Sequence, residues 1–283
     1  MAAQPPAPSA RSEAPPTGVV TGALRVFELS LGQMLWSRRT IFMALVVGLP
    51  VVVSIVIRGL VAFDVPVMRG SVTGPGVFGL MFWAFFVRFA VPVLAVFYGT
   101  ALIADEVEDK TITYLLTRPV RRASVVLGKY LAYLACTVSV VLPSIVVMWL
   151  LVVPINGSLA LSFPDLVADL LILVLGLATY GAVFALVGAS LKRPLVFGLL
   201  FVFGWENLAL ALPGYLRQLT VAHYLQGLVP HAMPAEGPLA FLQMALADAP
   251  SMTESLIGLA VLTLLGLGLA ARAVERREYV LEH

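Results

Sequence analysis

The sequence is poor in charge and in cysteine, and both shortages limit what the protein can be. Charged residues make up 12% of the 283 residues, whereas hydrophobic residues make up 60% and the mean hydropathy is +0.98. A chain of this composition cannot cover a water-facing surface with polar groups, which excludes a soluble globular domain. The single cysteine, Cys136, lies in an apolar run, which excludes a disulfide framework and a cysteine-rich metal site. The net charge of +2 is too small to indicate nucleic-acid binding. The sequence therefore predicts an integral membrane protein.

Several catalytic and cofactor motifs are also missing. The sequence has no G-x-x-x-x-G-K-[ST] phosphate-binding loop, and the nearest stretch, residues 127–130, lacks the first glycine and the hydroxyl residue. It has no H-E-x-x-H protease motif and no histidine within a predicted span to hold a haem. His223 and His231 lie near Glu236 and Asp248, but their spacing fits no metal-ligand pattern. We therefore expect neither enzymatic activity nor a bound metal or cofactor in this chain.

Long apolar runs recur along the chain. A helix rises about 1.5 Å per residue, and the runs are long enough to cross a hydrocarbon core of about 30 Å. They predict an all-α polytopic membrane protein with six transmembrane helices, over about residues 41–57, 78–104, 130–153, 166–191, 195–212 and 254–271. The fourth run is rich in small residues between Gly176 and Ala189, which would let neighbouring helices approach closely.

The segments around these spans differ in composition. We expect a disordered cytosolic tail (1–21), an amphipathic helix (22–40), a six-span transmembrane domain (41–271) with an outer segment that lies on the surface or re-enters the membrane (213–253), and a C-terminal cytosolic tail (272–283). The first tail is rich in alanine, proline and serine. The helix has apolar residues at three- and four-residue steps, which favours a helix along the cytosolic membrane surface. A water-soluble helix packed on a partner is the alternative.

The distribution of basic residues predicts the orientation of the chain in the membrane. The predicted inner segments carry Arg11, Arg25, Arg38, Arg39, Lys110, Arg118, Arg121, Arg122, Lys129, Lys192, Arg193, Arg272, Arg276 and Arg277, whereas the outer segments carry only Arg58, Arg69 and Arg217. Lysine and arginine are enriched in cytoplasmic loops. We therefore expect both termini in the cytosol, which requires an even number of spans.

One long charged segment, residues 103–129, lies between two apolar runs. It begins with the acids Asp105, Glu106, Glu108 and Asp109, continues with an apolar patch and ends with a basic cluster that surrounds Pro119. This order indicates a docking element. The alternative is an ordinary solvated loop whose basic half follows the bias of cytoplasmic loops.

The segment also carries a specific series of short motifs. They are an acidic pair after a span (Asp105-Glu106), a Lys-Thr step (Lys110-Thr111), a leucine pair (Leu115-Leu116), a proline followed by basic residues (Pro119, Arg121-Arg122) and a Gly-Lys that opens the next span (Gly128-Lys129). This series resembles the first cytoplasmic loop of type-2 ABC exporter permeases. The similarity extends more loosely over residues 20–280, and it is closest to the permeases associated with copper-enzyme maturation and gliding motility. Lys110 stands where that family commonly has glycine.

The resemblance implies a function and partners. Such a permease works as a homodimer or heterodimer in the cytoplasmic membrane, and two separate ATP-binding subunits, which hold the ATP and Mg²⁺, press on the loop that corresponds to residues 105–129. The residues implied to couple to the ATPase are Asp105, Glu106, Glu108, Asp109, Thr111, Leu115, Leu116, Arg118, Pro119 and Arg121. A short helix in this loop would fit a groove on the ATPase and transmit its closure to the spans as rigid-body rocking.

Two ionisable residues, Arg88 and Glu206, lie within the predicted spans. Burying either alone in lipid costs at least about 2.5 kcal/mol, so each needs a polar partner. Both are predicted in the outer half of the membrane, where they would pair with each other. The alternative is that Arg88 reaches the outer headgroups and Glu206 meets water in a cavity.

Two other functions fit the same features. One is a subunit that transports nothing and uses ATP-driven motion to act on a periplasmic partner, which a large outer domain would favour. The other is a secondary transporter driven by an ion gradient, which would need ionisable residues at the membrane midplane and often internal repeats. The sequence does not specify the substrate.

Overall fold

The computed structural model describes residues 19–63, 73–103, 122–211, 215–229 and 250–276 of the chain. Within these ranges the regular structure is helical. The elements are α1 (Val19–Leu35), α2 (Arg38–Ala62), α3 (Gly74–Met81), the π-helical η2 (Phe82–Ala90), α4 (Val91–Gly99), α7 (Arg122–Val152), α8 (Leu159–Ser190), α9 (Pro194–Leu200), the π-helical η3 (Phe201–Trp205), α10 (Glu206–Ala211), the 3-10 helix η4 (Tyr215–Leu219), α11 (Val221–Gln226) and α13 (Met252–Arg276).

Five of the helical stretches are long and apolar enough to cross a membrane. They are Arg39–Ala62, Gly74–Ile103, Ala123–Val152, Leu159–Ser190 and Met252–Arg276, and they correspond to the first four predicted spans and the sixth. Each begins earlier than predicted, because helical hydrogen bonding continues into flanking turns that are less apolar than the span. At the fifth predicted span, the apolar helix covers only Pro194–Ala209.

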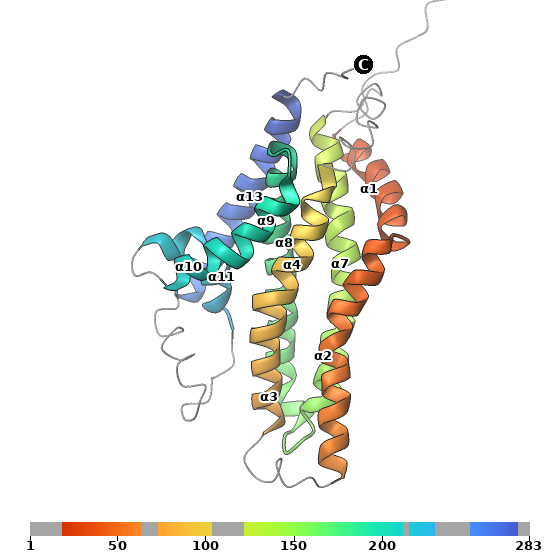
Figure 1. Cartoon of the computed structure of the whole chain (residues 1–283), viewed down its shortest axis with the longest axis vertical. Helices are drawn as coiled ribbons and strands as arrows, with labels where there is room; N and C mark the ends of the chain where they lie inside the picture. Colours follow the sequence, from red (N-terminus) through yellow and green to blue (C-terminus); the bar gives the residue numbers. More distant parts are fainter. Residues whose placement is uncertain (1–18, 64–72, 104–121, 212–214, 230–249, 277–283) are drawn as a thin grey trace, which may run out of the picture.

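The directions of neighbouring helices show how the chain continues after α8. The hydroxyl groups of Thr179 and Thr263 lie 3.0 Å apart, and a Cβ on Gly266 would lie 2.9 Å from the Ala182 carbonyl carbon. Because both contacts advance together along α8 and α13, the two helices are parallel. The chain between them must therefore return toward the end at which α8 began. The short helical segment α9–η3–α10 starts this return (Figure 1).

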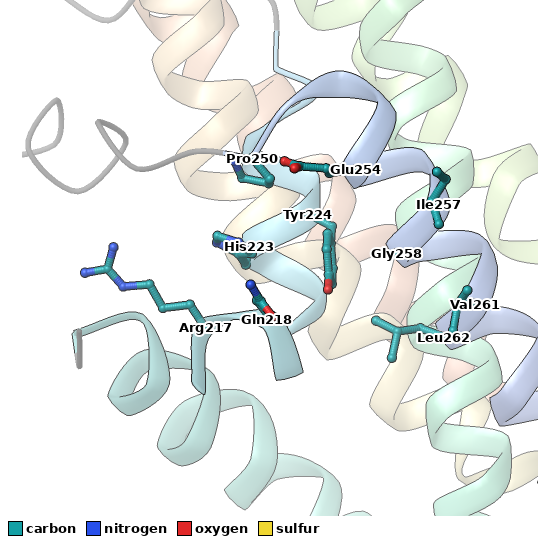
Figure 2. Close-up of a pocket in the computed structure, with 10 residues that line it drawn as sticks. All are labelled: Arg217, Gln218, His223, Tyr224, Pro250, Glu254, Ile257, Gly258, Val261 and Leu262. Atoms are coloured by element: carbon teal, nitrogen blue, oxygen red, sulfur yellow. The ribbon is translucent and has the colours of Figure 1, made fainter. Parts of the chain in front are cut away.

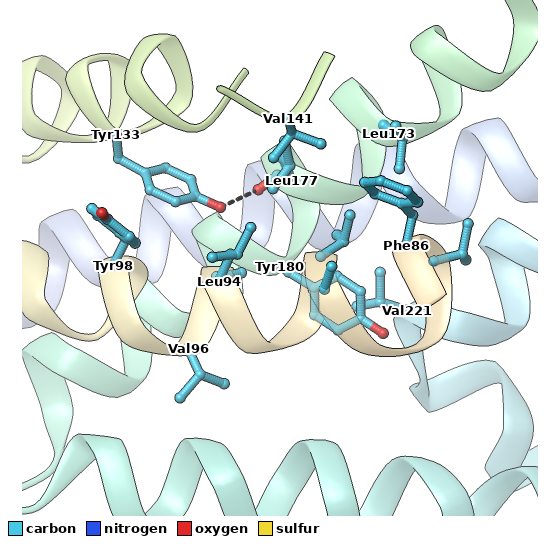
Figure 3. Packing of buried hydrophobic residues seen from close by; sticks show 14 of the residues in the cluster. Phe86, Leu94, Val96, Tyr98, Tyr133, Val141, Leu173, Leu177, Tyr180 and Val221 are labelled. Carbon is cyan, nitrogen blue, oxygen red and sulfur yellow. Dashed lines mark hydrogen bonds between the residues drawn. The ribbon is translucent and has the colours of Figure 1, made fainter. Parts of the chain in front are cut away.

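Helix α8 lies at the centre of the bundle, in contact with α4, α7 and α13. A Cβ on Gly188 would lie 2.3 Å from the Thr100 carbonyl oxygen of the neighbouring span, and one on Gly181 would lie 2.2 Å from the Tyr133 ring. The Tyr133 hydroxyl donates a 2.9 Å hydrogen bond to the Leu177 carbonyl (Figure 3). The close helix approach predicted from the small residues of this span is confirmed.

Helix α1 packs on the first turns of α7. A Cβ on Gly128 would lie 2.5 Å from the Ala23 carbonyl oxygen. The single helix predicted over residues 22–40 is wrong at both ends, since α1 already begins at Val19 and a break separates Leu35 from α2. The break has a local cause: both the N–H and the hydroxyl of Ser37 donate to the Met34 carbonyl and so turn the chain.

Helices α2 and α13 are at the edge of the bundle and expose apolar side chains. Leu45 of α2 is 71% exposed and Leu264 of α13 is 72% exposed. The central spans are more deeply buried and contribute most of the aromatic core that Figure 3 shows, including Phe86 and Tyr180. The outer faces of the edge helices suit contact with lipid chains.

Candidate functional site

The predicted coupling residues lie outside the described part of the chain. These are Asp105, Glu106, Glu108, Asp109, Thr111, Leu115, Leu116, Arg118, Pro119 and Arg121, so their role in contacting an ATPase remains a prediction. The structure does describe the two helices that flank them. The span that ends at Ile103 leads into the loop, and α7 begins after it at Arg122.

Helix α1 and the corner between α1 and α2 together contact both flanking helices. On the α7 side, Gly128 lies against α1. On the α4 side, the Tyr98 hydroxyl donates to the Thr40 hydroxyl over 3.3 Å, and the Thr40 hydroxyl donates in turn to the Met34 carbonyl of α1. A movement of the predicted coupling loop would therefore be passed to α1 through α7 and to the α1–α2 corner through α4.

The predicted intramembrane cation, Arg88, lies in the π-helical segment η2, about midway along the span Gly74–Ile103. In an α-helix, residues five apart point about 140° away from each other. A π-helix bonds i to i+5 and so brings such residues to one side. The guanidinium carbon of Arg88 accordingly lies 5.9 Å from the centroid of the Trp83 ring, at the distance of a cation–π contact.

Asn207 holds the Arg88 side chain from the neighbouring segment. The Arg88 Nη2 donates a 2.8 Å hydrogen bond to Asn207 Oδ1. The amide nitrogen of Asn207 donates back to two carbonyls of η3, those of Val202 and Phe203, over 3.3 and 3.0 Å. These two carbonyls fix the amide orientation, because only its nitrogen can donate to them. The second π-helical segment thus supplies the acceptors that position the Arg88 partner.

Glu206 is 3% exposed and bonds elsewhere. The Tyr180 hydroxyl of α8 donates a 2.6 Å hydrogen bond to Glu206 Oε2. The other oxygen, Oε1, has no hydrogen-bond partner in the described part of the chain. Hydrogen-bond donors such as the Tyr180 hydroxyl are the usual means of stabilising a buried carboxylate.

Among the described residues, Arg88 and Glu206 do not form the predicted direct ion pair. Successive helical residues point about 100° apart, so Asn207 faces η2 while Glu206 faces α8 and α11. For the alternative, Glu206 Oε2 accepts from Tyr180 while Oε1 has no hydrogen-bond partner in the described part of the chain, so contact of this carboxyl group with water stays a prediction. The two ionisable residues do belong to one polar layer, which we define as Trp83, Arg88, Tyr180, Glu206 and Asn207.

Sequence reasoning missed part of this layer and a further acid. Asn207 follows Glu206 directly in an apolar run, and this adjacency was a usable signal. Asp169 lies within α8 with no exposed surface, and a search of the fourth span for ionisable residues would have found it. The role of Tyr180 had no signal, because a tyrosine within a span is common in helix packing.

A cavity of about 840 Å³ lies beside the polar layer, between the η4–α11 segment and α13 (Figure 2). Arg217, His223 and Tyr224 line one side of it, and Glu254 and Val261 lie on the α13 side. Among the described residues no group of three or more histidine, cysteine, aspartate or glutamate side chains is placed to bind a metal. The expected absence of a metal remains a prediction, since His231, Glu236 and Asp248 lie outside the described residues.

Comparison with known proteins gives one family. Residues 62–276 match the family model described as ABC-2 family transporter protein. This match covers most of the chain and includes every element from α3 to α13. No curated protein has a significant sequence match to the chain.

Proposed function

This chain belongs to the ABC-2 family of transporter proteins, and we propose that it is the permease subunit of an exporter driven by ATP hydrolysis on a separate subunit. Membership of this family makes the chain a multi-pass membrane protein that works with an ATP-binding subunit. The match over residues 62–276 is the observation that carries the proposal. The sequence agrees with it, because the chain has no phosphate-binding loop of its own.

The proposed coupling runs from the ATPase through residues 105–129 into the bundle. In this mechanism, the ATPase contacts the loop between α4 and α7, and nucleotide-driven closure moves both helices together. Helix α1 and the corner that follows it support such a unit, because α1 contacts α7 at Gly128 and the corner contacts α4 through Tyr98. Helices that are held together by such contacts would move as one rigid body.

The proposed assembly is a dimer of permeases in the cytoplasmic membrane, with both termini and α1 on the cytosolic side. Substrate would pass between the two permeases. ATP and Mg²⁺ would be held by the ATP-binding subunit. Basic residues are concentrated at the start of α2, between α4 and α7, and between α8 and α9, and this excess supports the orientation.

The leucine pair of the coupling loop provides the test. We expect Leu115→Asp with Leu116→Asp to prevent co-purification of the ATP-binding subunit, because two charges would enter an apolar contact. The matched control is Leu216→Asp with Leu219→Asp, an exposed pair of η4 outside the five long spans and in the predicted outer segment, which should retain the ATPase. Affinity purification followed by quantification of the ATPase measures both.

The same preparation separates the proposed function from its alternatives. ATP-dependent accumulation of a substrate in inside-out vesicles supports export. An ATPase complex that transports nothing but requires a periplasmic protein for activity would instead support the subunit that acts on a periplasmic partner. Uptake by the purified chain alone, driven by an ion gradient, would contradict the ATP-driven mechanism.

A further inference from the structure

The surface around Arg88 differs from a lipid-facing surface. Its neighbours Phe89 and Phe203 are 38% and 51% exposed, and their ring centroids lie 6.4 Å apart. Arg88, which precedes Phe89, is half-buried, and Asn207, to which it donates, is exposed. A cation near the middle of a span is costly to expose to hydrocarbon. This face of η2 and η3 therefore requires a polar or anionic group against it.

The hydrogen bonding of Arg88 leaves capacity for such a group. A guanidinium has five N–H donors, and within the described residues the Arg88 guanidinium donates to one acceptor, Asn207 Oδ1. Glu206 does not occupy the remaining donors: its Oε2 accepts from Tyr180, and within the described residues its Oε1 accepts no hydrogen bond, from Arg88 or from any other group. The donors that remain can bind a carboxylate or a phosphate.

The geometry around Arg88 is fixed before any ligand arrives. Trp83 lies under the guanidinium within the same helix, and Asn207 is itself held by two carbonyls of the η3 region. A side chain that is already ordered loses little conformational entropy on binding. The arrangement is thus a built anion-binding site next to an aromatic surface.

We propose that Arg88, positioned by Trp83 and Asn207, binds the anionic headgroup of an amphipathic substrate whose apolar part lies along Phe89 and Phe203. This inference rests on the proposed permease function and names the substrate class: an apolar chain that ends in a carboxylate or a phosphate. In a symmetric dimer the partner copy contributes the same cation, and two such cations on one path would favour an anion between them.

A binding experiment on the complex in nanodiscs tests the proposal. The probe is a photoreactive dodecanoate, with dodecyl phosphate and uncharged dodecanol as competitors. We expect dodecyl phosphate to suppress labelling and dodecanol to have little effect. We expect Arg88→Gln to weaken dodecanoate binding about tenfold or more, because it removes a charge-assisted hydrogen bond. Arg88→Lys keeps the charge but not the planar fork, and its affinity should fall in between.

Arg58→Gln is the matched control, since Arg58 is an exposed arginine near the end of α2, and it should bind as the unchanged protein does. Equal binding by Arg88→Gln and the unchanged protein would overturn the proposal, as would equal competition by dodecanol. Loss of the permease dimer in Arg88→Gln, with anion binding unchanged, would assign Arg88 to a contact with the second copy and also overturn it. Labelling does not require ATP turnover, so failure of the proposed ATPase partnership would appear separately, as the absence of a co-purified ATPase.

Discussion

At the scale of single residues, the polar layer shows how a membrane bundle holds an acid in its interior. Glu206 is buried by α8 and α11, and the Tyr180 hydroxyl is its hydrogen-bond donor. Leaving a buried charged group without its donor costs about 1–3 kcal/mol or more. Removing the hydroxyl group of Tyr180 should therefore have a measurable effect on the stability of the protein.

We expect Tyr180→Phe to lower the free energy of unfolding by about 1–3 kcal/mol, because the carboxyl group loses its donor while staying buried. Thermal unfolding in detergent measures the change. Adding Glu206→Gln to the same protein should recover part of the loss, since the buried group is then neutral. Tyr224→Phe is the control, because no described hydrogen bond involves the Tyr224 hydroxyl. Strictly additive effects of the two substitutions would show that Tyr180 and Glu206 do not interact.

The same layer shows what a sequence can reveal about a site. Hydropathy identified Arg88 and Glu206 as the costly residues of two different spans, and both prove to lie in one layer. It gave no information on which side of its helix each residue faces. The π-helical segments η2 and η3 shift that side, and the apolar runs in which they occur carry no pattern that predicts them. The partner of each residue, the acceptor Asn207 for Arg88 and the donor Tyr180 for Glu206, was therefore established only by the structure.

At the scale of helices, the close contact of α8 with α4 depends on a missing side chain. A Cβ on Gly188 would lie 2.3 Å from the Thr100 carbonyl oxygen, and a backbone atom cannot move aside as a flexible side chain can. The helices would have to separate, and overpacking of this kind typically costs about 1–3 kcal/mol. The small residues of α8 thus determine the distance between the central spans.

We expect Gly188→Ala to lower the unfolding temperature in detergent, because it separates α4 from α8. Gly268→Ala in α13 should leave the temperature unchanged or raise it, since no atom lies within 4 Å of its added Cβ and alanine favours a helix by up to about 1 kcal/mol over glycine. The two variants make the same chemical change, but we expect the change in unfolding temperature to be negative for Gly188→Ala and zero or positive for Gly268→Ala. A shift of the same sign and size in both would refute the packing argument.

Hydropathy predicted the five long spans well because a span must present about 20 apolar residues to lipid, whatever its neighbours are. At the fifth, the helical stretch α9–η3–α10 covers nearly the predicted residues, but its apolar part, Pro194–Ala209, is shorter than the other five. The predicted outer segment 213–253 does contain short helices, as expected. The sequence left open whether they lie on the surface or re-enter the membrane, because their position depends on contacts such as that between Leu225 and Gly176 of α8.

At the scale of the whole molecule, the two ends of the predicted coupling loop are joined by one structural unit. Helix α1 touches α7 at Gly128, and the corner after α1 touches the end of α4 through Thr40 and Tyr98. A force applied to the loop would be shared by three spans, because α2 continues directly from this corner. The unit is therefore the part of the bundle best placed to convert ATPase closure into movement of the spans.

We expect Gly128→Ala to uncouple ATP hydrolysis from transport. Its Cβ would lie 2.5 Å from the Ala23 carbonyl oxygen and would displace α1 from α7, while the residues predicted to bind the ATPase are unchanged. ATP should still be hydrolysed by the complex, but transport per ATP hydrolysed should fall several-fold, which parallel assays in one proteoliposome preparation measure. Gly32→Ala, in α1 rather than α7 and with no atom within 4 Å of its added Cβ, should couple normally. If Gly128→Ala instead lost the ATPase altogether, α1 would belong to the docking surface rather than to the transmission of movement.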